Sequence, residues 1–162
     1  MKKLSFALLF ASALAFAAPK PQVQVTADSL VWTEPFGPGS IKVAKVSGDE
    51  KKGPYFVIMK MPPGFDSGWH THDFEYTGVV LAGTLENIEQ GGEAASKPIP
   101  AGSSWTQMGK VNHMTKCTAA TECMSYLAIK GGFTFTPKMP DGKPMPKETA
   151  KKEAMPAPTP SK

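Results

Sequence analysis

The feature that most constrains the fold of this chain is a long series of short strand-like runs. Between residues 22 and 136, apolar or alternating stretches recur between Gly, Pro, Asn and Asp residues, and helix signals are nearly absent. Many short strands at a spacing of about ten residues are typical of an antiparallel sandwich or a closed barrel. Closure would also remove the exposed edges of such strands. We therefore predict an all-β domain with strands at 23–26, 41–47, 55–61, 69–72, 77–81, 84–88, 96–99, 103–107, 111–116, 123–130 and 133–136.

The segment 1–17 has the pattern of a secretory signal peptide. Lys2 and Lys3 provide a positive start, and residues 4–16 form an apolar segment that is too short to span a bilayer. Small residues at the end of this segment offer a cleavage site, so we expect the mature chain to begin at Ala18, in the periplasm or outside the cell. An uncleaved anchor helix is the alternative, which the prolines that follow at once disfavour.

The C-terminal segment 137–162 is dominated by Pro, Lys, Ala and Glu and has no apolar period. Such a composition cannot bury enough apolar surface to offset the entropy that a chain loses on folding. We predict a disordered tail at 137–162, which leaves residues 18–136 as one domain with a single core.

The charge pattern argues against a nucleic-acid partner. The chain carries 18 basic and 14 acidic residues, a formal net charge of +4, and removal of a signal peptide would take away two of the lysines. No basic residue is arginine, so bidentate recognition of phosphate by a guanidinium group is absent. We expect no nucleic-acid partner and no stable insertion into a membrane.

Cys117 and Cys123 are the only cysteines, and they flank a short polar segment that is typical of a hairpin turn. An exported protein meets an oxidising environment, so we predict a disulfide between them. The alternative is that both thiolates join His113 at a metal ion, although this cysteine spacing matches no compact zinc pattern.

His70, His72 and His113 are the only histidines in the chain. Residues at positions i and i+2 of a strand project to the same face, so His70 and His72 can approach one ion together. A third imidazole from another strand would complete a set of three nitrogen ligands. Because neutral imidazole is the commonest metal-binding side chain, we predict a metal site, with histidines that bind no metal as the alternative.

These residues resemble the two motifs of the cupin superfamily. The first motif runs Gly, five residues, His-x-His, three or four residues, Glu, six residues and Gly, and Gly64, His70, His72 and Gly83 match it. The second contains Pro-x-Gly and then a histidine, which Pro100-Ala101-Gly102 and His113 match with a longer gap. The resemblance covers about residues 40–135. It implies a single cupin-type antiparallel β-barrel, or jelly roll, with a metal bound by the three histidines.

The chain departs from the family at the fourth metal ligand. Counted back from Gly83, the glutamate of the family falls at Tyr76 or Thr77, and neither supplies a carboxylate. Glu75 becomes a candidate ligand or proton shuttle if the strand begins at residue 75, because Glu75 and Thr77 would then share the inward face. Otherwise the site consists of three histidines and water. We expect Tyr76 and the other aromatic residues in the core, with the lining of a pocket above the metal as the alternative.

Three nitrogen ligands, with or without a carboxylate, suit Fe, Zn, Mn, Ni or Cu, and the Irving–Williams order does not choose among them. The resemblance implies a small-molecule ligand or substrate and leaves the function open. One hypothesis is a metal-dependent enzyme, such as an oxygenase, an isomerase or a hydrolase. The others are a non-catalytic periplasmic module that binds or senses a small ligand or a metal, and a metal-free structural barrel. Cupins often dimerise by strand exchange, so a homodimer is a further expectation.

Overall fold

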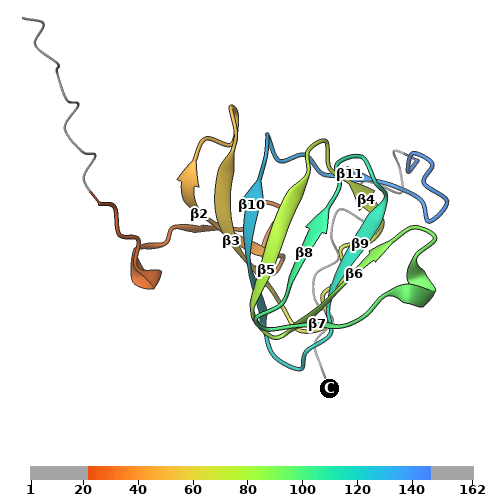
Figure 1. Ribbon diagram of the computed structural model, residues 1–162, viewed down its shortest axis with the longest axis horizontal. Helices are drawn as coiled ribbons and strands as arrows, with labels where there is room; N and C mark the ends of the chain where they lie inside the picture. Colours follow the sequence, from red (N-terminus) through yellow and green to blue (C-terminus); the bar gives the residue numbers. More distant parts are fainter. Residues whose placement is uncertain (1–21, 147–162) are drawn as a thin grey trace, which may run out of the picture.

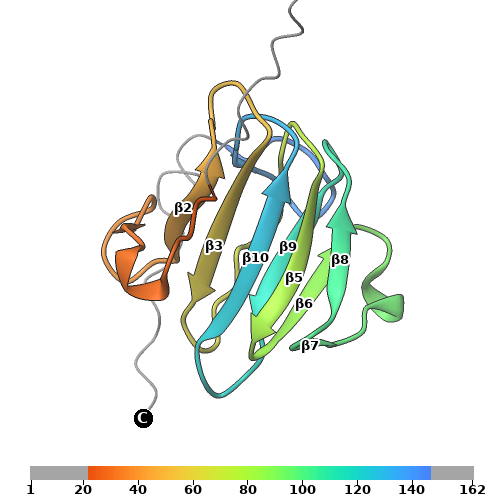
Figure 2. The ribbon, with the colours of Figure 1, turned by 60° about the vertical axis from the view of Figure 1, so that its left-hand side comes forward.

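The computed structural model describes residues 22–146, which form two antiparallel β-sheets with almost no helix. The larger sheet has six strands in the order β1 (Trp32–Thr33), β2 (Lys42–Gly48), β3 (Tyr55–Met61), β10 (Cys123–Ile129), β5 (Tyr76–Ala82) and β8 (Ser104–Gln107). The smaller has five in the order β11 (Thr136–Pro137), β4 (His70–Thr71), β9 (His113–Cys117), β6 (Thr84–Glu89) and β7 (Ile99–Pro100). Two short 3₁₀ helices lie in loops, at Ala27–Ser29 and Glu93–Ala95. Figure 1 shows the two sheets, and Figure 2 looks onto the larger one with β9 and β6 behind it.

The core lies between the two sheets because the central strands alternate buried and exposed residues. In β5, Tyr76, Gly78 and Val80 are buried while the residues between them are exposed or half-buried. The same period of two is present in β9 and β10, as expected for strands that bury one face. The main apolar cluster joins residues of the larger sheet to residues of the smaller one: Met61, Val80 and Cys123 with Leu85 and Cys117.

The predicted disulfide is confirmed, and it links the two sheets. Cys117 ends β9 in the smaller sheet and Cys123 begins β10 in the larger one, and a disulfide joins them with a Cα–Cα distance of 5.8 Å. The alternative in which these thiolates bind a metal is therefore wrong. Gly83 lies against this bond at the crossing from β5 to β6. A Cβ on Gly83 would lie 2.8 Å from Cys123 Sγ, and its φ of +76° also favours glycine.

The prediction of an all-β antiparallel fold is confirmed, whereas closure into a barrel is not. Within residues 22–146, no strand of one sheet is hydrogen-bonded to a strand of the other. Three of the four edge strands, β1, β7 and β11, are only two residues long. Strands of this length cannot form the continuous ladder that closure needs, although their shortness limits the exposed edge.

Two boundaries also differ from expectation. The predicted strand at 23–26 is wrong, because this exposed segment has no strand beside it within the described residues. The predicted disordered tail includes residues 137–146, yet Pro137 pairs with His70 and Lys138 N donates to Trp69 O at 2.8 Å. Backbone hydrogen bonds to other segments hold these residues in place, and such bonds cannot be predicted from amino-acid composition. The rest of the predicted tail and the predicted signal peptide lie outside the described residues. Within 22–146, no helix has the length and apolar character needed to cross a bilayer.

Candidate metal centre

The three histidines meet because β4 pairs with β9. His70 in β4 lies directly opposite His113, the first residue of β9. His72 follows two residues after His70 and therefore projects to the same face. All three side chains are buried, with exposed fractions of 3% for His70, 6% for His72 and 0% for His113. The predicted set of histidines is thus assembled on the inner face of the smaller sheet.

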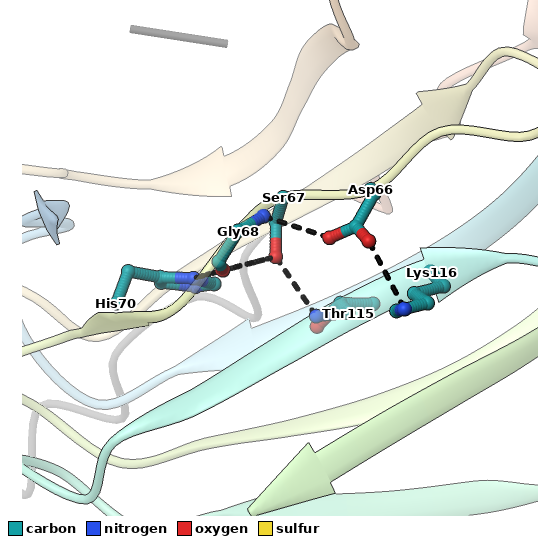
Figure 3. A network of polar contacts seen from close by, with 6 residues as sticks. All are labelled: Asp66, Ser67, Gly68, His70, Thr115 and Lys116. Carbon is teal, nitrogen blue, oxygen red and sulfur yellow. Dashed lines mark hydrogen bonds and ion pairs between the residues drawn. The ribbon is translucent and has the colours of Figure 1, made fainter. Parts of the chain in front are cut away.

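The loop before β4 is clamped onto β9, as Figure 3 shows. Ser67 Oγ accepts a hydrogen bond from Thr115 N at 2.8 Å, and Ser67 N donates to Thr115 O at 3.0 Å. Asp66 accepts from Gly68 N at 2.9 Å and forms an ion pair with Lys116 at 3.1 Å. The left-handed φ of +63° at Gly68 lets the chain turn here. These contacts fix the carbonyl of Gly68, which is a partner of His70.

Each imidazole uses its Nδ1 atom to donate to a backbone carbonyl. His70 Nδ1 lies 2.9 Å from Gly68 O, and His113 Nδ1 lies 2.9 Å from Val111 O. His72 Nδ1 makes the equivalent contact with Thr134 O. A carbonyl oxygen can only accept, so Nδ1 carries the proton in all three rings and Nε2 carries the lone pair. This arrangement fixes both the tautomer and the orientation of a metal-binding histidine.

The Nε2 atoms converge without a donor among the imidazoles. His70 Nε2 lies 3.1 Å from His72 Nε2, and the ligand atoms of all three histidines lie within 4.8 Å of one another. Two lone pairs at this distance repel each other unless a positive charge lies between them. The donor set therefore fits a transition-metal ion, for which three imidazole nitrogens are suitable ligands.

Burial keeps these imidazoles neutral. It lowers the pKa of His70 to about 2, where the neighbouring His113 and His72 contribute in the same direction. Burial likewise lowers the pKa of His72 to about 4, against the opposing hydrogen bond to Thr134 O, and it lowers the pKa of His113. A metal must displace a proton from a charged imidazole but not from a neutral one, so the site is ready to bind at neutral pH.

Two of the histidines, His70 and His72, line a small apolar cavity of about 40 Å³. Phe135 stacks on His70 with ring centroids 4.4 Å apart, and Phe133 contacts His72 at 4.6 Å. A larger groove of about 650 Å³ lies beyond this cavity, along β1, β2, β3 and β10. The two spaces share their lining residues Phe36, Ile41, Met59, Leu127, Phe133 and Phe135. These shared side chains lie between the outer groove and the histidine centre.

Glu75 does not join the histidines. Its carboxylate forms an ion pair with Lys130 at 2.7 Å, and the possible metal ligands that cluster within the described residues are the three histidines alone. The expected inward face of Glu75 and Thr77 is wrong, because β5 buries Tyr76, Gly78 and Val80 and leaves Thr77 exposed. The structure thus agrees with the alternative of a site without this carboxylate.

Tyr76 is the residue that sequence reasoning undervalued. Its side chain is buried, and its hydroxyl lies 3.5 Å from His113 Nε2. Burial raises the pKa of Tyr76 to about 12, so the phenol is neutral without a metal. The spacing back from Gly83 already named this position. The inward direction of Val80, a buried apolar residue in the same strand, would have selected Tyr76 over Thr77.

Comparisons with known proteins identify the family and the fold. A family model described as a domain of unknown function (DUF4437) matches residues 23–147. No curated protein has a significantly matching sequence. An RmlC-like cupin from Ralstonia eutropha JMP134 aligns with a TM-score of 0.61 and 11% identity, covering 85% of this chain and 92% of that one. The polyketide cyclase RemF from Streptomyces resistomycificus gives 0.59 and 13%, covering 70% and 83%.

A third solved structure is a protein from Methylibium petroleiphilum PM1 that is provisionally assigned as an acetylacetone dioxygenase. It aligns with a TM-score of 0.57 and 22% identity, covering 82% of this chain and 91% of that one. At these identities the likeness shows the fold, and the resemblance to cupins is confirmed. The chain belongs to the DUF4437 family and has a cupin fold.

Proposed function

We propose that this member of the DUF4437 family is an exported metal-dependent enzyme that acts on a small, largely apolar molecule. The observation that carries the proposal is the convergence of three buried Nε2 atoms whose Nδ1 atoms are all anchored to carbonyls. His70, His72 and His113 would hold Fe, Zn, Mn, Ni or Cu. When bound, such a metal supplies polarisation of a substrate oxygen or activation of O₂.

The groove beside the centre supports an apolar substrate. Its volume of about 650 Å³ is within the range of small-molecule sites, and most of its lining residues are aliphatic or aromatic. Lys45 and Glu50 are the charged residues of the lining and can orient a polar end of the substrate. Phe133 and Phe135 would hold the other end beside the histidines and exclude water from them.

The names of two structural neighbours suggest where to look for turnover. One is provisionally assigned as a dioxygenase of acetylacetone, and the other is called a polyketide cyclase. We expect this chain to act on small enolic or phenolic compounds. An assay panel should include O₂ uptake with β-diketones and phenols, together with esterase and isomerase substrates.

Metal content tests the centre itself. Protein purified without a histidine tag should contain about one transition-metal ion per chain, and His113→Ala should contain almost none. Glu75→Gln is a matched control, because it removes a nearby carboxylate that pairs with Lys130 rather than with the histidines. Equal metal content in wild type and His113→Ala would refute the proposed centre. Loss of metal in Glu75→Gln would show that the Glu75 carboxylate is a metal ligand after all.

A non-catalytic module that binds or senses a small ligand or a metal is the second candidate. One observation favours it: the residues that line the small cavity beside the histidines include no Asp, Glu or Lys that could act as an acid or base. Sub-micromolar binding of metal or of an apolar ligand, without turnover in the same panel, would support this candidate over the enzyme.

Two further parts of the proposal concern the whole chain. Export predicts that protein recovered from the periplasm or the medium begins at Ala18, which N-terminal sequencing would test. The homodimer stays a prediction, and light scattering after size exclusion would measure it.

A further inference from the structure

Tyr76 places a buried phenol oxygen beside the histidine centre. The small cavity there is lined by three residues with a side-chain oxygen: Ser67, Tyr76 and Thr115. Ser67 Oγ donates to Gly68 O at 3.0 Å and accepts from Thr115 N at 2.8 Å. Thr115 Oγ1 donates to Asn87 Oδ1 at 2.9 Å. Both hydroxyls are therefore engaged with their own surroundings.

The Tyr76 hydroxyl faces His113. It lies 3.5 Å from His113 Nε2, which is long for an O–H donor, and the side chains of Trp105 and Thr115 are its other polar neighbours. This Nε2 is the atom through which His113 faces the other two imidazoles. A separation of 3.5 Å leaves room for one ion to be approached by both atoms, because metal–nitrogen bonds to histidine are about 2.0–2.1 Å long.

The strand holds Tyr76 in this position. Tyr76 begins β5 and is paired on one side with Ile129 in β10 and on the other with Gln107 in β8. Its ring contacts His72 with centroids 5.4 Å apart and Trp105 at 6.2 Å, and only 5% of the residue is exposed. A buried ring with both neighbours fixed cannot turn its hydroxyl to solvent.

We propose that Tyr76 is the fourth protein ligand of the metal and that its oxygen binds beside the three imidazoles. This inference rests on the proposed binding of a metal by His70, His72 and His113. Binding through the phenolate would release the hydroxyl proton to solvent, so the centre would gain one negative ligand in place of a carboxylate. An anionic oxygen favours metals in a higher oxidation state, and we expect Fe(III) and Cu(II) to be held more tightly than Fe(II) and Zn(II) relative to a centre of three imidazoles.

Absorption spectroscopy of the metal-loaded protein tests this assignment. A phenolate bound to Cu(II) or Fe(III) gives a ligand-to-metal charge-transfer band in the visible region, with phenolate vibrations enhanced in the resonance Raman spectrum. Wild-type protein loaded with one Cu(II) or Fe(III) per chain should show both signals. Tyr76→Phe should lose them, keep its bound metal through the histidines, and bind Cu(II) roughly tenfold more weakly, as expected when one supporting ligand is removed.

The chain allows a control that does not depend on the folding of Tyr76→Phe. It contains three tyrosines, and Tyr55 and Tyr126 lie away from the centre: Tyr55 lines the outer groove, and Tyr126 stacks on Phe56. The double variant Tyr55→Phe/Tyr126→Phe leaves Tyr76 as the only tyrosine. It should keep the full charge-transfer signal.

The outcomes separate this inference from the proposed function. One bound metal per chain without a charge-transfer band, or a band that Tyr76→Phe retains, would overturn the ligand assignment and leave the histidine centre standing. Failure of the wild-type protein to bind metal at all would overturn both.

Discussion

Replacement of His70 by leucine is expected to leave the metal-free protein about as stable as the wild type while abolishing its response to metal. His70 is 3% exposed. Truncation of a large buried side chain usually lowers the free energy of unfolding by about 2–5 kcal/mol. At this position, however, the wild-type imidazole itself lowers the stability of the metal-free protein. Its Nε2 lone pair is buried 3.1 Å from that of His72, with no donor between them.

The balance of free energies can be estimated from the contacts of His70. Removal of a buried, unsatisfied acceptor is expected to recover about 1–3 kcal/mol. The variant loses the hydrogen bond to Gly68 O, worth about 1 kcal/mol, and that carbonyl keeps its second donor, Ser67 Oγ. It also loses the stacking on Phe135, worth about 1 kcal/mol. Because the gain and the losses are similar, we expect the free energy of unfolding to change by less than about 1 kcal/mol.

Urea unfolding with and without metal measures both halves of this prediction. At a free metal concentration one hundred times Kd, the wild type should be stabilised by about 2.7 kcal/mol, and the variant should not respond. In thermal unfolding this corresponds to roughly 10 °C, at about 4 °C per kcal/mol for a domain of this size. If metal-free His70→Leu lost 3 kcal/mol or more, the imidazole would be a satisfied core residue and the argument from converging lone pairs would be refuted.

Three further predictions concern the metal-free protein. Burial lowers the pKa of His72 to about 4 and that of His70 to about 2, from 6.5 in the unfolded chain. Below pH 6.5, the unfolded chain therefore binds protons that the folded chain does not. Stability is therefore full above pH 6.5 and falls by about 2 kcal/mol per histidine at pH 5; equal urea midpoints at pH 7.5 and pH 5 would contradict this. Loss of the Cys117–Cys123 disulfide, whose cysteines are six residues apart, should lower the free energy of unfolding by about 2 kcal/mol. Unfolding with and without reductant measures this loss. The double alanine variant, which reductant cannot affect, is the control. Gly78→Ala would place a Cβ against the Trp105 ring and should cost about 1–3 kcal/mol. Gly131→Ala should cost less, because Phe74, the residue in its way, is 48% exposed and can rotate. Equal thermal shifts in the two variants would show that Trp105 also moves freely.

The histidine set could be predicted from the sequence because it depends on local rules. Strand alternation places His70 and His72 on one face, and the Pro-x-Gly turn leads toward the strand that carries His113. The same rules gave the central strands, which are long enough to show a period of two. They failed at the ends of the sheets, where β1 and β11 have two residues each and form by pairing with a neighbour rather than by their own pattern.

The fourth ligand position was harder because it depends on one residue of register. In one register Glu75 and Thr77 face inward, and in the other Tyr76, Gly78 and Val80 do, which is the register that β5 adopts. The charge of Glu75 made it the more obvious metal ligand, yet Lys130, the residue directly after β10, forms an ion pair with its carboxylate. That ion pair joins residues far apart in the sequence, and no local pattern announces it.

The segment after β10 links the centre to the groove in a way that only the structure reveals. Thr134 accepts the hydrogen bond from His72 Nδ1, while its neighbours Phe133 and Phe135 form part of the wall between the histidines and the groove. Successive residues of an extended chain point in different directions, so one short segment can serve both purposes. His70 and His113 are instead anchored by carbonyls next to β4 and β9, which the groove does not touch. A ligand that displaces Phe133, whose ring contacts His72 at 4.6 Å, must therefore disturb the support of His72 before that of the other two histidines. In the metal-loaded protein, a groove ligand that displaces Phe133 should then alter the metal spectrum through His72 first, whereas one that displaces Phe135 should also reach His70, on which Phe135 stacks.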